Sequence, residues 1–249
     1  MIIIPSYQRF EKLKLNTLAY LKMHGILDEE ICVVISEHDE QLDQYLSLPC
    51  GVLVTSANKI GQVHNFITET FQEGEFIIEL DDDIRDIKDK DLESIGDFRF
   101  LMDAARSLMI KHDCSYCGTY AVNNKMFMNK SNEITTDLCY CLGLIRFRFI
   151  RKEIELKTDY SEDFENCIRH YIRDGKIVRM NHVVGITSNY SSGGCCGSGR
   201  DNDTEREHKE RLMAMFPDYV RLFVRKNGKT DIRLKDRSKK KKVIDDIHN

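Results

Sequence analysis

The chain has 249 residues, of which 41% are hydrophobic and 31% are charged, and its formal net charge is −4 at pH 7. This length can bury one large core or two small ones, and the composition is ordinary for a soluble globular protein. The net charge excludes a general polycation, and no apolar run is long enough for a membrane span or an N-terminal secretory signal. We therefore expect a soluble, cytoplasmic protein.

Strands and helices alternate over the first ninety residues. Short β-branched runs bounded by polar or turn residues predict buried strands at 2–4, 31–35, 51–54 and 76–80. Apolar residues at helical spacing predict amphipathic helices over 15–21 and 60–71. This alternation is typical of a parallel sheet covered by helices on both faces, with ligands at the carboxyl ends of its strands.

The second half of the chain is less regular. Its patterns predict helices over 98–109 and 164–172 and strands at 116–122, 142–149 and 177–184. A glycine-rich stretch then precedes a charged helix that stops at Pro217, and Asn227-Gly228 between two apolar runs predicts a β-hairpin. We divide the chain into a domain over 1–190, an extension over 191–234 with loop, helix and hairpin, and a basic tail over 235–249.

The nine cysteines do not have the spacing of a secreted disulfide framework, and their number is odd. Cys114-x-x-Cys117 and Cys139-x-Cys141 could together make a zinc site. Both pairs lie in apolar or aromatic segments that resemble strands, so we favour reduced, mostly buried thiols.

Three consecutive aspartates, Asp81, Asp82 and Asp83, directly follow the predicted strand at 76–80. Adjacent like charges repel one another, and a divalent cation would turn that repulsion into coordination. Mg²⁺ and Mn²⁺ favour carboxylate oxygens and often leave substrate phosphates to complete the shell. A solvated turn with a helix-capping aspartate is the simpler alternative, but three acids after a buried strand favour the metal.

Two other predicted strand ends carry groups that suit an anion. Backbone N–H groups, a hydroxyl and an arginine follow the first strand and precede a helix, where they can hold a nucleotide. The candidates there are Pro5, Ser6, Tyr7 and Arg9. The candidates after the third strand are Asn58, Lys59, Gly61 and Asn65. Each is weak alone, but together with the aspartates they predict a diphosphate site at one edge of the sheet.

The order of these motifs resembles that of nucleotide-sugar glycosyltransferases of the GT-A fold. The resemblance rests on IPSYQR, SANKIGQVHN, FIIELDDD and SEDFENCIRHYIRDGKIVR, and spans roughly residues 1–185. It implies an α/β, Rossmann-type, mostly parallel sheet flanked by helices, with a small C-terminal extension. It also implies that the aspartates form the family's DxD motif. Asp81 and Asp82 would then contact the nucleotide sugar, while Asp81 and Asp83 would bind the Mn²⁺ or Mg²⁺ that bridges the diphosphate.

The resemblance also implies a catalytic pair. Glu162-Asp163 matches the family's acidic motif at the head of a later helix, and in inverting members the aspartate is the general base. We therefore predict Asp163 as the base beside Glu162, although first-turn charge compensation would also explain the pair. His182 is a candidate metal ligand, because some members take a histidine from a late loop; a structural histidine is the alternative. His64, on a predicted apolar helix face, is expected to pack rather than to bind metal.

The chain is further similar to the TET/JBP-associated glycosyltransferases, viral and protist relatives of the base J glucosyltransferase. This similarity implies transfer of glucose from UDP-glucose to hydroxymethylpyrimidine in DNA, in the host cytoplasm if the protein is viral. A glycan acceptor is the alternative. The Ser191–Arg200 loop could be a lid over the donor or acceptor, or merely a disordered connector. The segment Arg233–Lys242 holds seven basic residues and one acid, which suits either a phosphate-backbone contact or a solvated tail.

Two other function classes remain open. Phosphatases of the haloacid dehalogenase type also carry Asp-x-Asp after a strand, but normally after the first strand and followed by Thr or Val. Here Ile84-Arg85 follow, and three predicted strands precede. The chain could instead be a non-catalytic nucleic-acid-binding module that uses its basic tail. The sequence does not predict the oligomeric state.

Overall fold

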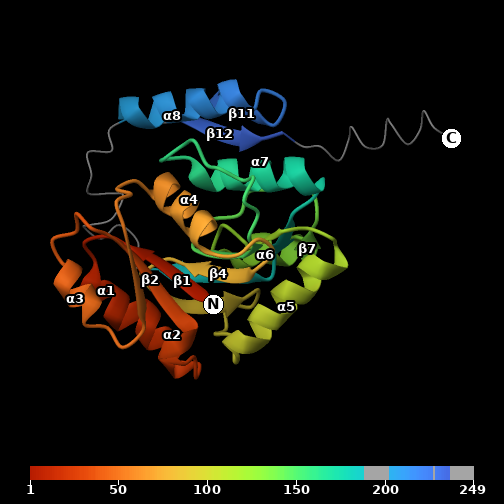
Figure 1. The fold of residues 1–249 in the computed structure, drawn as a ribbon. Helices are drawn as coiled ribbons and strands as arrows, with labels where there is room; N and C mark the ends of the chain where they lie inside the picture. The colour runs from red at the N-terminus through yellow and green to blue at the C-terminus, as the bar shows by residue number, and fades with distance from the viewer. Residues whose placement is uncertain (188–201, 227, 236–249) are drawn as a thin grey trace.

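The computed structural model describes residues 1–187, 202–226 and 228–235. Its centre is an eight-stranded sheet (Figure 1). The strands are β1 (Ile2–Ser6), β2 (Ile31–Ser36), β3 (Gly51–Thr55), β4 (Phe76–Leu80), β6 (Tyr116–Thr119), β7 (Ile134–Thr135), β8 (Ile145–Phe149) and β9 (Val178–Met180). They lie in the order β3-β2-β1-β4-β8-β6-β9-β7. β1 to β4 are all parallel, whereas β8 runs antiparallel to β4 and β6. The predicted α/β class is confirmed.

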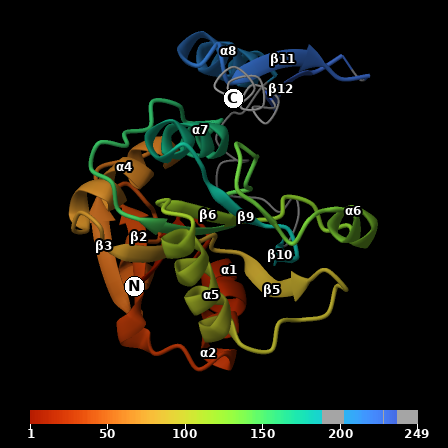
Figure 2. The same ribbon diagram turned by 90° about the vertical axis from the view of Figure 1, so that its right-hand side faces the viewer.

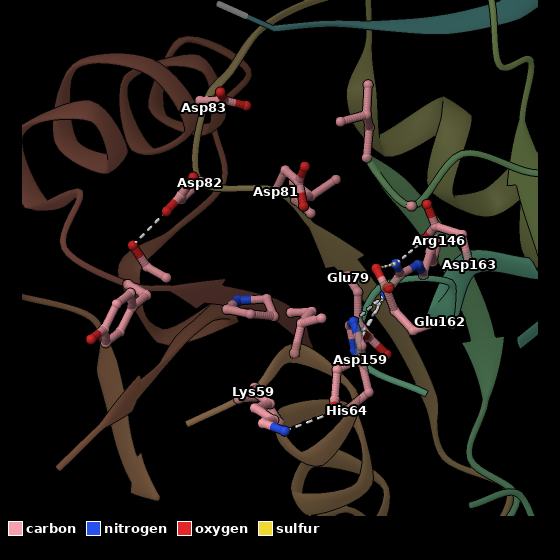
Figure 3. Close-up of a pocket in the computed structure, with 18 of the residues that line it drawn as sticks. Lys59, His64, Glu79, Asp81, Asp82, Asp83, Arg146, Asp159, Glu162 and Asp163 are labelled. Carbon is pink, nitrogen blue, oxygen red and sulfur yellow. Dashed lines mark hydrogen bonds and ion pairs between the residues drawn. The ribbon is translucent and has the colours of Figure 1, made fainter. Parts of the chain in front are cut away.

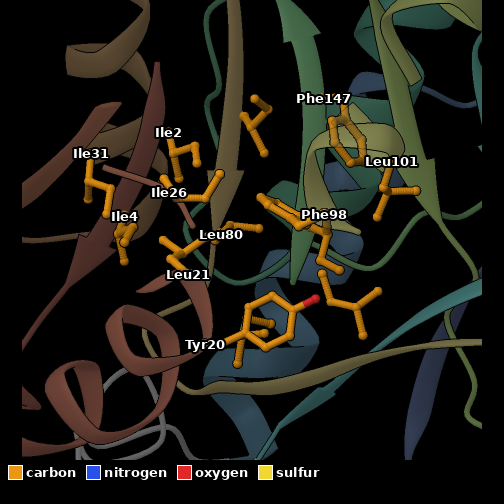
Figure 4. Packing of buried hydrophobic residues seen from close by; sticks show 14 of the residues in the cluster. Ile2, Ile4, Tyr20, Leu21, Ile26, Ile31, Leu80, Phe98, Leu101 and Phe147 are labelled. Carbon is orange, nitrogen blue, oxygen red and sulfur yellow. The ribbon is translucent and has the colours of Figure 1, made fainter. Parts of the chain in front are cut away.

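Helices cover both faces of this sheet (Figure 1). One face carries α1 (Phe10–Leu13), the π-helix η1 (Lys14–Leu18), α2 (Ala19–Met23) and α5 (Phe98–Lys111). The other carries α4 (Ile60–Thr70) and α7 (Glu162–Asp174). Because successive strand residues point to opposite faces, Ile2 and Ile4 pack in one core and Ile3 packs in the other. Figure 4 shows the first core, in which Tyr20 meets Phe98.

The remaining elements correct several expectations. β5 (Ile84–Asp89) pairs antiparallel with β10 (Val183–Thr187) in a separate small sheet (Figure 2). The charged sequence of β5 did not predict a strand. The single strand expected at 177–184 is wrong, because Asn181 and His182 separate β9 from β10. Connections contain α3 (Leu42–Leu46), α6 (Lys125–Lys130) and the 3₁₀-helix η2 (Asp28–Glu30).

The predicted C-terminal helix and hairpin are confirmed as α8 (Asn202–Met215), β11 (Val220–Val224) and β12 (Thr230–Leu234). They lie over α7 in Figures 1 and 2. Leu212 and Ile232 share a hydrophobic core with Ile168 and Tyr171 of α7, so the extension is anchored on the main sheet domain. The Ser191–Arg200 loop and the tail beyond Lys235 lie outside the described residues. Among the described helices, none combines the length and apolarity that a bilayer crossing needs.

Candidate active site

A cavity of about 440 Å³ lies at the edge of the sheet where β1 and β4 end (Figure 3). This volume is in the usual range for small-molecule sites. Its walls also include the start of α4, the loop before β8 and the start of α7. The cavity brings together most of the predicted site residues, namely Pro5, Ser6, Tyr7, Arg9, Asn58, Lys59, Asp81, Asp82, Asp83, Glu162 and Asp163.

Three predicted site residues do not line this cavity. A side chain on Gly61 would overlap the carbonyl oxygen of Thr158, so α4 packs directly on that loop backbone. The Asn65 amide donates to the Leu156 carbonyl at 2.9 Å and accepts from the Leu156 N–H at 2.8 Å. Gly61 and Asn65 therefore hold the loop before α7 rather than facing the cavity. His182 places Nδ1 3.0 Å from the Glu133 carbonyl oxygen, away from the aspartates.

The three aspartates point in different directions (Figure 3). Asp82 accepts hydrogen bonds from Ser6 Oγ at 2.7 Å and from Arg9 Nη1 at 3.1 Å. Asp83 Oδ2 lies 3.8 Å from the same Arg9 nitrogen. The Asp81 carboxylate faces the cavity and accepts no hydrogen bond from another described residue. Burial, followed by the negative charge of Asp82, raises the pKa of Asp81 to about 7.

Thr17 fixes the turn that carries these aspartates. Its hydroxyl donates to the Asp81 carbonyl at 2.7 Å and accepts from the Ile84 N–H at 2.9 Å. Thr17 lies in η1, and π-helical turns within α-helices are frequently found at functional sites. The helical pattern over 15–21 did not predict this contact.

A divalent cation fits the aspartate turn. The Asp81 carboxylate is a partly buried negative group without a donor, and a cation would supply the missing positive charge. Within the described residues, no three or more His, Cys, Asp or Glu side chains are placed to hold a metal together. Asp81 and Asp83 would therefore need substrate oxygens to complete the shell, as is common for Mg²⁺ bound with phosphates.

Glu162 and Asp163 occupy the first turn of α7 on the opposite wall (Figure 3). Arg146 of β8 donates a hydrogen bond to Asp163 Oδ1, and Tyr140 Oη lies 3.4 Å from Asp163 Oδ2. Burial, together with the charge of Asp163, raises the pKa of Glu162 to about 8. The helix N-terminus favours negative charge at this position.

Charged side chains form a buried floor beneath the cavity. Glu79, Arg146, Arg148 and His64 have side chains between 2% and 5% exposed. His64 Nδ1 lies 2.6 Å from Glu79 Oε2, and its Nε2 accepts from Arg146 Nη1. Burial, reinforced by the charge of Arg146, lowers the pKa of the His64 imidazole. His64 lines the cavity, and its surroundings are the charged groups of Glu79 and Arg146 rather than the apolar face expected from the sequence.

Sequence reasoning missed several lining residues. Lys59 and Asp159 both line the cavity and form an ion pair, with Lys59 Nζ 3.3 Å from Asp159 Oδ2 (Figure 3). The neighbouring Tyr160 ring meets the His208 ring of α8 at 4.7 Å, so the extension reaches the rim. Gly143 and Arg146 lie in a stretch predicted as one strand. The two arginines within that otherwise apolar run, Arg146 and Arg148, were a signal that could have indicated buried charged groups there.

No protein-family model and no curated protein matches the sequence. Solved structures do match. S. aureus TarS 1–349 in complex with UDP-GlcNAc superposes with a TM-score of 0.60 at 16% identity, over 87% of this chain and 66% of that chain. Glucosyl-3-phosphoglycerate synthase from Mycobacterium tuberculosis, in complex with Mn²⁺, UDP and glucosyl-3-phosphoglycerate, superposes with a TM-score of 0.53 at 9% identity, over 94% of this chain and 86% of that chain. The chain thus spans just under two thirds of the TarS structure, and the likenesses show the GT-A fold.

Proposed function

We propose that the protein is a metal-dependent glycosyltransferase that moves a sugar from a nucleoside diphosphate to a hydroxyl acceptor. One observation carries the proposal: the aspartate turn and the Glu162-Asp163 pair form opposite walls of one cavity. A cation-binding wall and an acidic wall are what the two halves of this reaction require. The GT-A fold shared with structures solved with UDP or UDP-GlcNAc supports this assignment.

The donor half uses the ends of β1 and β4. Asp81 and Asp83 would hold Mn²⁺ or Mg²⁺, which when bound neutralises the charge of the leaving diphosphate. Arg9 and Lys59 also line the cavity, where their positive charges can attract phosphate oxygens. Asp82 is bonded to Ser6 and Arg9, so its contribution is to orient these two residues toward the donor.

The acceptor half uses the start of α7. The Asp163 carboxylate takes the proton from the acceptor hydroxyl, and the resulting oxygen attacks the anomeric carbon as the bond to the diphosphate breaks. Attack from the side opposite the diphosphate inverts the anomeric centre. The raised pKa of Glu162 keeps its carboxyl protonated at neutral pH. Glu162 can then donate a hydrogen bond to the acceptor, while Asp163 accepts the proton.

The finer assignments are predictions from sequence similarity. They are glucose as the sugar, hydroxymethylpyrimidine in DNA as the acceptor and a place in the viral TET/JBP-associated group. A glycan acceptor fits the same cavity. The uridine nucleotides in both neighbours favour a UDP-sugar donor. The GT-A fold argues against a haloacid dehalogenase phosphatase. A non-catalytic module would not need an acidic pair that lines the same cavity as the aspartate turn.

The test is a donor screen. We expect the protein to hydrolyse one UDP-sugar slowly, and only with Mn²⁺ or Mg²⁺, when UDP-glucose, UDP-GlcNAc and GDP-mannose are offered separately. Hydroxymethylated DNA and oligosaccharides are then added with the active donor to find the acceptor. If calorimetry detects no binding of UDP with Mn²⁺ and no donor is consumed, the proposed function is wrong.

A further inference from the structure

Arg146 is buried in the middle of the sheet, yet it reaches the cavity wall. Its side chain is 4% exposed on β8, between β4 and β6. The guanidinium contacts Asp163 through Nη2 and His64 through Nη1, and lies 3.7 Å from Glu79 Oε2. A buried charge is tolerated only when it is paired and hydrogen-bonded. These partners on β4, α4 and α7 therefore hold the guanidinium in one place.

Gly143 leaves the space in which Arg146 and Asp163 meet. A Cβ atom at this position would overlap both Arg146 Nη2 and Asp163 Oδ1. A side chain at this position would therefore displace the guanidinium or the carboxylate from the contact. The same loop is tied to the donor wall, because the Asp81 N–H donates to the Leu144 carbonyl at 3.0 Å. The short loop at 142–144 thus connects the two walls of the cavity.

We propose that Arg146 and Gly143 are positioning residues for Asp163, an inference that rests on the proposed function. Arg146 holds Asp163 Oδ1 and so fixes the rotation of the carboxylate. Oδ2, which also lies 3.4 Å from Tyr140 Oη, then accepts the proton of the acceptor hydroxyl. Gly143 makes the contact between Arg146 and Asp163 sterically feasible. Arg146 is anchored by Glu79 on β4, the strand that directly precedes Asp81, so the same side chain sets the base relative to the donor site.

Arg146→Lys and Gly143→Ala test this role. Lysine keeps the charge but cannot contact Asp163 and His64 together as the guanidinium fork does. We expect each variant to lower kcat by about 10²-fold, the cost of misplacing a reacting group by about 1 Å, with donor affinity unchanged. The matched control is Arg151→Lys, two positions beyond the end of the same strand. Arg151 pairs with Glu73 at 2.9 Å and does not line the cavity, so its variant should keep wild-type kcat.

A double variant distinguishes an Arg146 that acts by positioning Asp163 from an Arg146 that contributes to the reaction independently. If Arg146 acts through Asp163, Arg146→Lys should have no further effect in the Asp163→Asn background, because residues that act as a unit are not additive. A full additional loss there, or a loss of donor affinity equal to the loss of kcat, would overturn the inference. So would wild-type kcat in both single variants. Gly143→Ala leaves the buried charges intact and carries the test if Arg146→Lys does not fold. A wild-type protein that consumes no donor would refute the proposed function instead.

Discussion

Glu79 and Arg146 lie directly opposite each other on the antiparallel strands β4 and β8, with Glu79 Oε2 3.7 Å from Arg146 Nη1. Glu79 precedes the aspartate turn by two residues, and Arg146 contacts the acidic pair at the start of α7. Burial alone would raise the pKa of the Glu79 carboxyl, but the charges of Arg148 and the other buried bases hold it below its usual range. One cross-strand ion pair therefore links the two walls of the cavity.

We expect Asp81→Asn and Asp83→Ala to weaken Mn²⁺-dependent UDP binding without unfolding the protein. Changes to residues that merely support a metal ligand cost about 10–100-fold in affinity, so loss of a direct ligand should cost more. Calorimetry with UDP, with and without Mn²⁺, measures the effect. Asp91→Asn is a suitable control, because Asp91 pairs with Lys125 outside the cavity. Unchanged affinity in both variants would remove the aspartates from the metal site.

Asp163→Asn should lower sugar transfer by about two to four orders of magnitude, because the amide has the same shape but cannot take the proton. Donor affinity should change little, since Asp163 lies on the wall opposite the aspartate turn. Initial rates and donor titrations of Asp163→Asn and Glu162→Gln measured side by side would assign the base. Near-normal transfer by Asp163→Asn would give that role to another residue.

His170 should make the fold less stable in mild acid. Burial, reinforced by the charges of Arg148 and Arg173, holds its pKa well below the ordinary value, and Ser115 Oγ lies 2.8 Å from its Nδ1. The unfolded chain therefore binds the proton more readily as pH falls below about 6.5, and stability falls by up to about 1.4 kcal/mol per pH unit from this site.

Urea unfolding at several pH values between 7.5 and 5 measures that slope. His170→Phe should flatten it, because the substituted ring cannot be protonated in either state. His38→Gln is the control, since that side chain is 61% exposed and its loss should leave the slope unchanged. An identical slope in His170→Phe and in the native chain would show that His170 does not contribute.

The hairpin provides a test of a DNA acceptor. Arg221 and Arg233 are exposed and directly opposite each other on β11 and β12, and within the described residues neither makes an ion pair. Like charges in this arrangement are destabilising, and a phosphate between them would remove the repulsion. If DNA binds here, Arg221→Ala and Arg233→Ala should each weaken binding and flatten the log–log salt dependence by about 0.9.

Salt titrations on hydroxymethylated duplex DNA measure this dependence. Removal of the basic tail after Leu234 should flatten it further and leave donor hydrolysis unchanged. Arg225→Ala is the matched control, because Arg225 is already bonded to Asp231. If the intact protein does not bind DNA at low salt, the DNA acceptor is wrong and a glycan takes its place.

The sequence by itself determined the sheet class and most of the cavity. Strand patterns located the ends of β1, β3 and β4, and parallel strands bring such ends to one edge, so Ser6, Lys59 and Asp81 were predictable as neighbours. The strand ends depend on local periodicity, which a single stretch of chain carries. The acidic pair of α7 followed instead from the resemblance in motif order.

Only the tertiary structure decided which surface each remaining side chain meets. Asn65 lies on the predicted helix, but its amide bonds Leu156, which is 91 positions away in the chain. The alternation Ile145-Arg146-Phe147-Arg148 is typical of a strand with one face in water, yet both arginines are buried against Glu79. A local pattern records that two faces differ in polarity. Whether the polar face meets water or buried carboxylates depends on long-range packing, which here brought Arg146 to Asp163.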